Sequence, residues 1–208
     1  MLKLIILALA GYLLGSVNPS YIIGRIKGVD IRQKGSGNAG GSNAVINFGK
    51  LIGIICIILD IAKSALIVYL AKWLIGEPVG VAICGTAVIL GHMFPFYMGF
   101  KGGKGFACLS GFVLAYAPLV FLIMLVFTVI LVLVTDYICI APMADSVIFA
   151  VVYGILTKSI IGAAVIGIAA VAIFFRHREN IKRIRAGNEL HFSYLLNKDK
   201  EMERISDK

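Results

Sequence analysis

The chain has 208 residues, of which 60% are hydrophobic and 15% are charged, and its mean hydropathy is +0.95. A soluble core of this length cannot bury so much apolar surface, so the composition excludes a soluble globular domain and predicts an integral membrane protein. The net charge of +9 is dispersed between apolar runs, which favours anionic lipids or substrates over nucleic acid as partners.

The first apolar run extends from about Leu2 to Ile23. We interpret it as a retained span instead of a cleaved signal peptide, because no small-x-small cleavage site leads into a soluble domain. Ser16, Asn18 and Ser20 place polar groups near its end. Such groups in membrane helices commonly bond across helices or line a site.

The segment from Arg25 to Lys50 is predicted to be a loop with a glycine-rich centre. Backbone N–H groups, hydroxyls and amides in such a run can converge on one anion. A flexible linker is the alternative, but the interspersed asparagines and the apolar run that resumes at Ala44 favour a binding site. The candidate substrate-binding or catalytic residues of this run are Gly35, Ser36, Gly37, Asn38, Ser42 and Asn43.

A second span is predicted from Leu51 to Ile75, and it contains Asp60 and Lys63. These two residues are three apart and share a helix face, so we expect a structural ion pair in the bundle interior, with the wall of a polar site as the alternative. The remaining spans bring the total to about seven helices, with the long apolar run after Gly105 split at Tyr116–Pro118, and they are Val79–Met98, Gly105–Tyr116, Pro118–Val134, Ile138–Leu156 and Ile160–Phe175.

A second glycine-rich segment, Lys101-Gly102-Gly103-Lys104-Gly105, lies between two of these spans. Glycine lets the backbone turn several N–H groups toward one anion while the lysines supply charge. The segment is not a Walker loop, because Gly103-Lys104 is followed by glycine and not by serine or threonine. The alternative is an ordinary cytoplasmic loop enriched in lysine by the positive-inside rule.

The basic region after Phe175 predicts the orientation of the bundle, because segments rich in lysine and arginine stay in the cytoplasm. With an odd number of spans, the N-terminus is then outside. Both glycine-rich segments and the tail fall on the cytoplasmic face, where we expect one composite pocket. The whole chain is predicted to be one membrane domain, with residues 176–208 as a basic cytoplasmic tail. Without the two loops, His177 would equally fit an interfacial residue of a tail that binds anionic lipid.

The four cysteines all lie in apolar runs without paired spacing. They are Cys56, Cys84, Cys108 and Cys139. We therefore interpret them as small hydrophobic residues and expect neither a disulfide nor a metal site.

Three motifs follow one another along the chain. The first is Gly35-Ser36-Gly37-Asn38 with Ser42 and Asn43, the second is Gly91-His92 with Phe94-Pro95 and Phe100–Gly105, and the third is His177-Arg178-x-Asn180-Ile181-x-Arg183 with Gly187 and Glu189. In this order they resemble the bacterial PlsY family of acyl-phosphate:glycerol-3-phosphate acyltransferases, and the similarity runs the length of the chain.

The resemblance implies a seven-helix enzyme of the bacterial inner membrane that transfers a fatty acyl group from acyl-phosphate to the 1-hydroxyl of glycerol-3-phosphate, giving lysophosphatidic acid. It implies no cofactor, and we expect a monomer. By carry-over, Ser36 and both glycine loops hold phosphate, with Lys101, Gly102 and Gly103 among the substrate-binding residues. Lys104 holds substrate phosphate, while His177 and Asn180 position the reacting groups. A phosphate oxygen of the substrate would act as base, with His177 as the rival general base.

The chain departs from this family at two places. Ile46 stands where the family has an arginine, and Asp136–Pro142 replaces a segment with an arginine and two serines. Losing a guanidinium weakens phosphate binding, and Asp136 would repel phosphate if it faced the site. The alternatives are therefore a relative with another acceptor, or a non-catalytic membrane protein that binds lipid or acyl-phosphate. A transporter fits less well, since the polar residues cluster at one face and not at the midplane.

Overall fold

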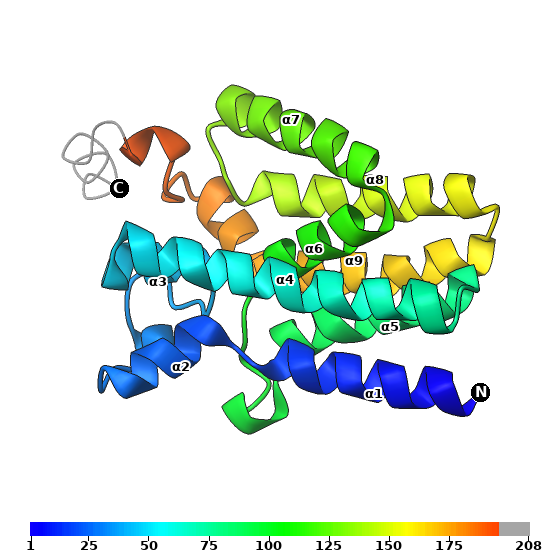
Figure 1. Cartoon of the computed structure of the whole chain (residues 1–208). Coiled ribbons are helices and arrows are strands. Elements are labelled where there is room, and N and C mark those ends of the chain that lie inside the picture. The colour runs from blue at the N-terminus through cyan, green and yellow to red at the C-terminus, as the bar shows by residue number, and fades with distance from the viewer. Residues whose placement is uncertain (196–208) are drawn as a thin grey trace.

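The computed structural model describes residues 1–195, and this part of the chain contains helices and loops but no strand (Figure 1). Its α-helices are α1 (Leu2–Ser16), α2 (Pro19–Ile26), α3 (Gly41–Phe48), α4 (Lys50–Leu74), α5 (Pro78–Met93), α6 (Phe106–Tyr116), α7 (Pro118–Thr135), α8 (Ile140–Thr157) and α9 (Ile160–Arg185). Short 3-10 helices cover Ile31–Gln33, Phe96–Met98 and Phe192–Leu195. The prediction for the tail beyond residue 195 lies outside the described residues.

Five helices of the described chain are long and apolar enough to cross a membrane, and a sixth span results if the bent pair α1 and α2 is counted as one. The all-helical membrane bundle is thus confirmed. The apolar run after Gly105 is divided as expected, since α6 ends at Tyr116 and α7 begins at Pro118. Because α6 has only 11 residues, the number of crossings and the orientation of the termini stay predictions.

The expected first span is interrupted, because the chain bends by 41° between α1 and α2. Two residues start a new helix at this bend. Asn18 caps α2 by accepting a hydrogen bond of 2.8 Å from the Tyr21 N–H, and Pro19 occupies the first helical position. The break leaves carbonyls at the end of α1 without partners inside the helix.

Close backbone packing joins α1 to α5, the helix that is most buried in the bundle. A Cβ atom at Gly15 would collide with the backbone of Val88, and one at Gly91 would collide with the Tyr12 carbonyl. Small residues at such crossings let two membrane helices approach closely. The contact fixes α5, and therefore the loop that follows it, against the α1–α2 break.

One predicted boundary was wrong, because the loop expected from Arg25 to Lys50 contains α3, which begins at Gly41. The last predicted span, Ile160–Phe175, lies within a longer helix, since α9 continues without interruption to Arg185. The beginning of the predicted tail is therefore a rigid extension of a membrane helix.

Candidate functional site

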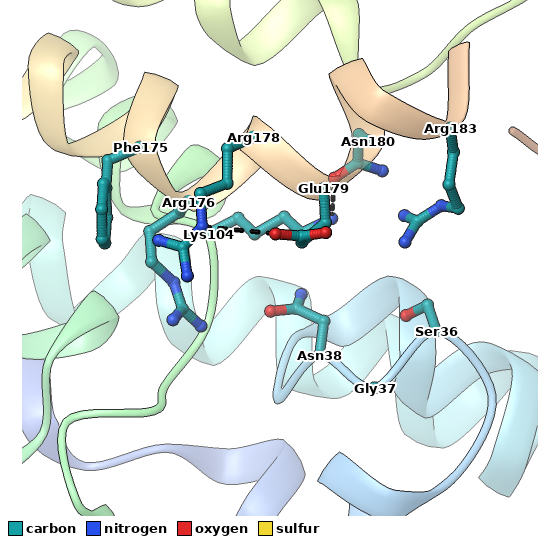
Figure 2. A pocket seen from close by; sticks show the side chains of 10 residues that line it. All are labelled: Ser36, Gly37, Asn38, Lys104, Phe175, Arg176, Arg178, Glu179, Asn180 and Arg183. Carbon is teal, nitrogen blue, oxygen red and sulfur yellow. Dashed lines mark hydrogen bonds and ion pairs between the residues drawn. The ribbon is translucent and has the colours of Figure 1, made fainter. Parts of the chain in front are cut away.

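A cavity of about 180 Å³ lies between the first glycine-rich loop and the C-terminal part of α9 (Figure 2). Lys104 reaches into the space between these two elements. The lining residues come from three segments that are distant in sequence, and they are Ser36, Gly37, Asn38, Lys104, Phe175, Arg176, Arg178, Glu179, Asn180 and Arg183. The structure thus brings together both glycine-rich segments and the basic end of α9.

Asn43 holds the first glycine-rich loop in shape. Its side-chain nitrogen lies 2.9 Å from each of the carbonyl oxygens of Ile31, Lys34 and Asn38, and its oxygen accepts a hydrogen bond from the Ser36 N–H. Gly35 and Gly37 have φ values of 55° and 70°, in the left-handed region that glycine adopts without strain. These contacts present Ser36 and Asn38 toward the cavity.

The prediction that Asn43 binds substrate is not supported by its position. Asn43 is fully buried and its amide is used within the loop, and Ser42 is exposed outside the cavity lining. Gly35 also lies outside the lining. By contrast, the carboxamide oxygen of Asn38 is buried without a hydrogen-bond partner among the described residues, so it can accept a bond from a ligand.

The second glycine-rich loop packs on the end of α5. The Gly102 N–H donates to the Met93 carbonyl (3.1 Å) and the Gly103 N–H donates to the His92 carbonyl (3.0 Å). The expectation that these two N–H groups turn toward a phosphate is therefore wrong. Close approach explains the glycines instead, because a Cβ at Gly102 would collide with the His92 carbonyl and one at Gly103 with the His92 ring.

Arg176 on α9 also binds the second glycine-rich loop. Its guanidinium donates to the Gly103 carbonyl at 3.1 Å and to the Gly102 carbonyl at 2.6 Å. Lys101 is exposed and lies outside the cavity lining, so only the second lysine of the loop reaches the site.

A chain of hydrogen bonds fixes Lys104. Its ammonium group donates to the Asn180 side-chain oxygen at 2.5 Å, and the Asn180 nitrogen donates to the Glu189 carboxylate at 2.5 Å. Arg183 donates to the second oxygen of Glu189, also at 2.5 Å. Burial lowers the pKa of Lys104 to about 8, with Glu189 opposing this shift and Arg183 adding to it.

Within residues 1–195, four cationic side chains line the cavity, namely Lys104, Arg176, Arg178 and Arg183. The acid in this part of the lining is Glu179, which is exposed and pairs with Arg178 at 3.3 Å and with Lys182 at 3.2 Å. A small site surrounded by guanidinium and ammonium groups suits an anion of the size of phosphate.

His177 does not line this cavity. The side chain is buried, and its Nδ1 atom lies 2.8 Å from the Ile173 carbonyl of the same helix. The expectation that His177 points into the pocket with Ser36, Asn38 and Lys104 is therefore not met. Arg176 and Asn180 line the cavity, whereas the His177 ring is buried against its own helix.

Ile46 and Asp136, which stand at the two departures noted in the sequence, are not among the residues that line the cavity. Ile46 is on α3 with 55% of its surface exposed. The Asp136 carboxylate accepts hydrogen bonds from the N–H and the hydroxyl of Ser193, at 2.8 and 2.7 Å. Asp136 therefore holds the segment that follows Glu189, and it is not among the residues that line the cavity.

Sequence reasoning missed the arginines as lining residues. Arg176, Asn180 and Arg183 are spaced by four and three residues, which is the signal for one helix face. That signal was readable only with the knowledge that α9 continues beyond Phe175.

Comparison with known proteins gives consistent results. A family model described as glycerol-3-phosphate acyltransferase matches residues 5–187. Proteins named glycerol-3-phosphate acyltransferase are similar to this chain, with 34% identity in Bacillus velezensis (86% of this chain and 92% of the relative) and 36% in Streptococcus thermophilus (96% and 98%).

Two crystal structures of PlsY, an integral membrane glycerol 3-phosphate acyltransferase, are also similar. The glycerol 3-phosphate form has a TM-score of 0.86 and 32% identity, and the lysophosphatidic acid form has a TM-score of 0.83 and 31% identity. Each match covers 93% of this chain and 97% of the PlsY chain.

Proposed function

We propose, from the premise that this chain belongs to the glycerol-3-phosphate acyltransferase family, that its cavity binds glycerol-3-phosphate and directs the 1-hydroxyl toward an acyl-phosphate. The protein is a membrane acyltransferase whose product is lysophosphatidic acid. In the proposed reaction the hydroxyl oxygen attacks the acyl carbonyl carbon. A new ester C–O bond forms, the C–O bond of the mixed anhydride breaks, and inorganic phosphate leaves.

The observation that carries this proposal is the position of Lys104, which Asn180 orients within a cavity lined by three further cations. Lys104 neutralises substrate phosphate, and Ser36 and Asn38 supply a hydroxyl and an amide from the opposite wall. Such an arrangement lowers the barrier by holding two reactants together and stabilising developing negative charge.

No covalent intermediate is needed, because phosphate is a good leaving group. Cys139 is an unsuitable nucleophile, since its side chain is buried and it is not among the residues that line the cavity. His177 is apart from the cavity lining, which argues against its action as general base. We therefore assign the hydroxyl proton to a phosphate oxygen of the substrate.

We further propose that the cavity opens at the cytoplasmic face of a bacterial inner membrane and that the protein acts as a monomer. The positive-inside rule supports this orientation, because α2 and the loop that follows it lie at the same end of the bundle as the C-terminal end of α9 (Figure 1). Arg25, Lys27 and Lys34 belong to this part of the chain.

The deciding experiment measures acyl transfer by the purified protein from palmitoyl-phosphate, with and without glycerol-3-phosphate. We expect lysophosphatidic acid only with the acceptor. Phosphate release that is independent of glycerol-3-phosphate would favour another acceptor or simple hydrolysis. Binding of palmitoyl-phosphate without turnover would favour the non-catalytic alternative.

A further inference from the structure

Asp60, Lys63 and His92 form a buried polar cluster in the bundle next to the second glycine-rich loop. The Lys63 ammonium lies 2.7 Å from the Asp60 carboxylate, which confirms the predicted ion pair. The His92 Nδ1 atom lies 3.2 Å from the same carboxylate oxygen and 3.2 Å from the Lys63 nitrogen. All three side chains are buried, and none of them lines the cavity.

The place that a metal ion could take in this cluster is filled by the ammonium group of Lys63. Asp60, His92 and Cys108 offer ligand atoms within 4.8 Å of one another, a spacing that would suit a metal ion. However, the Lys63 ammonium already lies against the carboxylate and the imidazole. The positive charge that these groups stabilise is therefore the lysine.

Lys63 connects this cluster to the α1–α2 break and so to the first glycine-rich loop. Its ammonium donates to the carbonyls of Gly15 (2.8 Å) and Val17 (2.7 Å). These carbonyls lack helical partners because α1 ends there, and a buried cation satisfies both. The next residue, Asn18, donates from its side chain to the Ala39 carbonyl at 2.7 Å. Ala39 immediately follows the cavity residue Asn38.

His92 connects the cluster to the second loop. Its carbonyl accepts the Gly103 N–H, and its ring fills the space beside Gly103 so closely that a Cβ there would collide with Nε2. Gly103 is followed directly in the chain by Lys104. The cluster is thus linked to Asn38 on one wall through two hydrogen bonds and to Lys104 on the other wall through one.

We propose that Asp60, Lys63 and His92 act as one positioning unit that fixes the spacing between Asn38 and Lys104. The inference rests on the proposed function, because that spacing matters only if both walls hold the same substrates. None of the three residues touches substrate. They act through the α1–α2 break and through Gly103.

The test compares Lys63→Met with the double variant Lys63→Met/Asp60→Asn. The single variant leaves an unpaired buried carboxylate and should lower the melting temperature. The double variant lacks both charges of the Asp60–Lys63 pair, so it should recover much of that stability, but the Gly15 and Val17 carbonyls remain without the ammonium. We expect the double variant to keep kcat/KM reduced by about 10²-fold, the scale of a small misplacement of reacting groups. A purely structural cluster would recover activity together with stability.

Asp145→Asn is the matched control, because Asp145 is also a buried carboxylate in a long apolar helix but accepts a hydrogen bond from Thr128 on α7, and it bonds to neither glycine-rich loop among the described residues. It should leave the KM for glycerol-3-phosphate unchanged, whatever its melting temperature. Wild-type kcat/KM in the folded double variant would overturn the inference. Inactivity of the unmodified protein in the same assay would instead overturn the proposed function, so the two failures are distinguishable.

Discussion

The side-chain oxygen of Asn180 lies 2.5 Å from the ammonium of Lys104. Because Asn180 also donates to Glu189, its amide cannot turn around without losing both contacts. The carbonyl oxygen is thereby kept toward the lysine and the ammonium is kept toward the cavity.

Replacing Lys104 by alanine should raise the KM for glycerol-3-phosphate by about tenfold to a hundredfold, the effect of one lost charge-assisted hydrogen bond. Lys101→Ala is the matched control, since Lys101 carries the same charge three residues away but is exposed outside the cavity. Steady-state kinetics should show a raised KM for glycerol-3-phosphate in the Lys104→Ala variant and an unchanged KM in the Lys101→Ala variant. Equal effects would mean that the loop contributes only general positive charge.

Acceptor binding should weaken as the pH rises through about 8, because burial lowers the pKa of Lys104 to that value and the cation is then lost. Above it, the KM for glycerol-3-phosphate should rise by about tenfold per pH unit if Lys104 alone accounts for the charge. Asn180→Asp places a carboxylate beside the ammonium, which favours the charged lysine and should move this rise to higher pH. A KM profile that is the same in both proteins would show that another group controls binding.

The variant Ile46→Arg restores the arginine that the resembled family has at this position. It tests whether binding of glycerol-3-phosphate is weaker without that guanidinium. Since four cations already line the cavity and Ile46 is largely exposed, we expect a change in acceptor KM of less than about threefold, below the effect of one charge-assisted bond. A fall of tenfold or more in the acceptor KM, with the donor KM unchanged, would show that the phosphate site is incomplete in this chain.

Gly103→Ala should abolish most activity and lower thermal stability, because the new methyl group would collide with the His92 ring. Gly167→Ala serves as the control, since nothing lies within 4 Å of a Cβ there and α9 should gain up to about 1 kcal/mol from the better helix former. Melting temperatures and kcat/KM should separate the two variants. A fully active Gly103→Ala protein would contradict the packing described for the loop.

Cysteine labelling tests the orientation. The native cysteines are buried, so a membrane-impermeant maleimide should not label the unmodified protein. Ser42→Cys and Lys101→Cys place thiols at exposed positions on the two glycine-rich segments. Both should label only from the cytoplasmic side. Labelling from opposite sides would separate the segments and exclude a common pocket.

The sequence predicted which groups are polar but not which partner each one takes. The ion pair of Asp60 and Lys63 and the split before Pro118 follow from local spacing, and both are confirmed. The amide of Asn43 is used inside the loop, and the sequence does not indicate this because its three carbonyl partners become neighbours only when the loop closes. His177 lies outside the cavity lining, and the sequence does not indicate this because the rotation of α9 about its axis depends on packing against other helices.

The N–H groups of Gly102 and Gly103 are bonded to α5, and Asn43 ties the first loop to itself. Both cavity walls therefore lose their conformational entropy during folding and not when a substrate arrives. Such a preorganised site should accept the glycerol moiety as a nearly rigid body, so backbone hydrogen exchange in these loops should already be slow in the apoprotein. Discrimination between acceptors then depends on how well each one fits a fixed shape, and a longer polyol phosphate should be rejected because the walls cannot move apart.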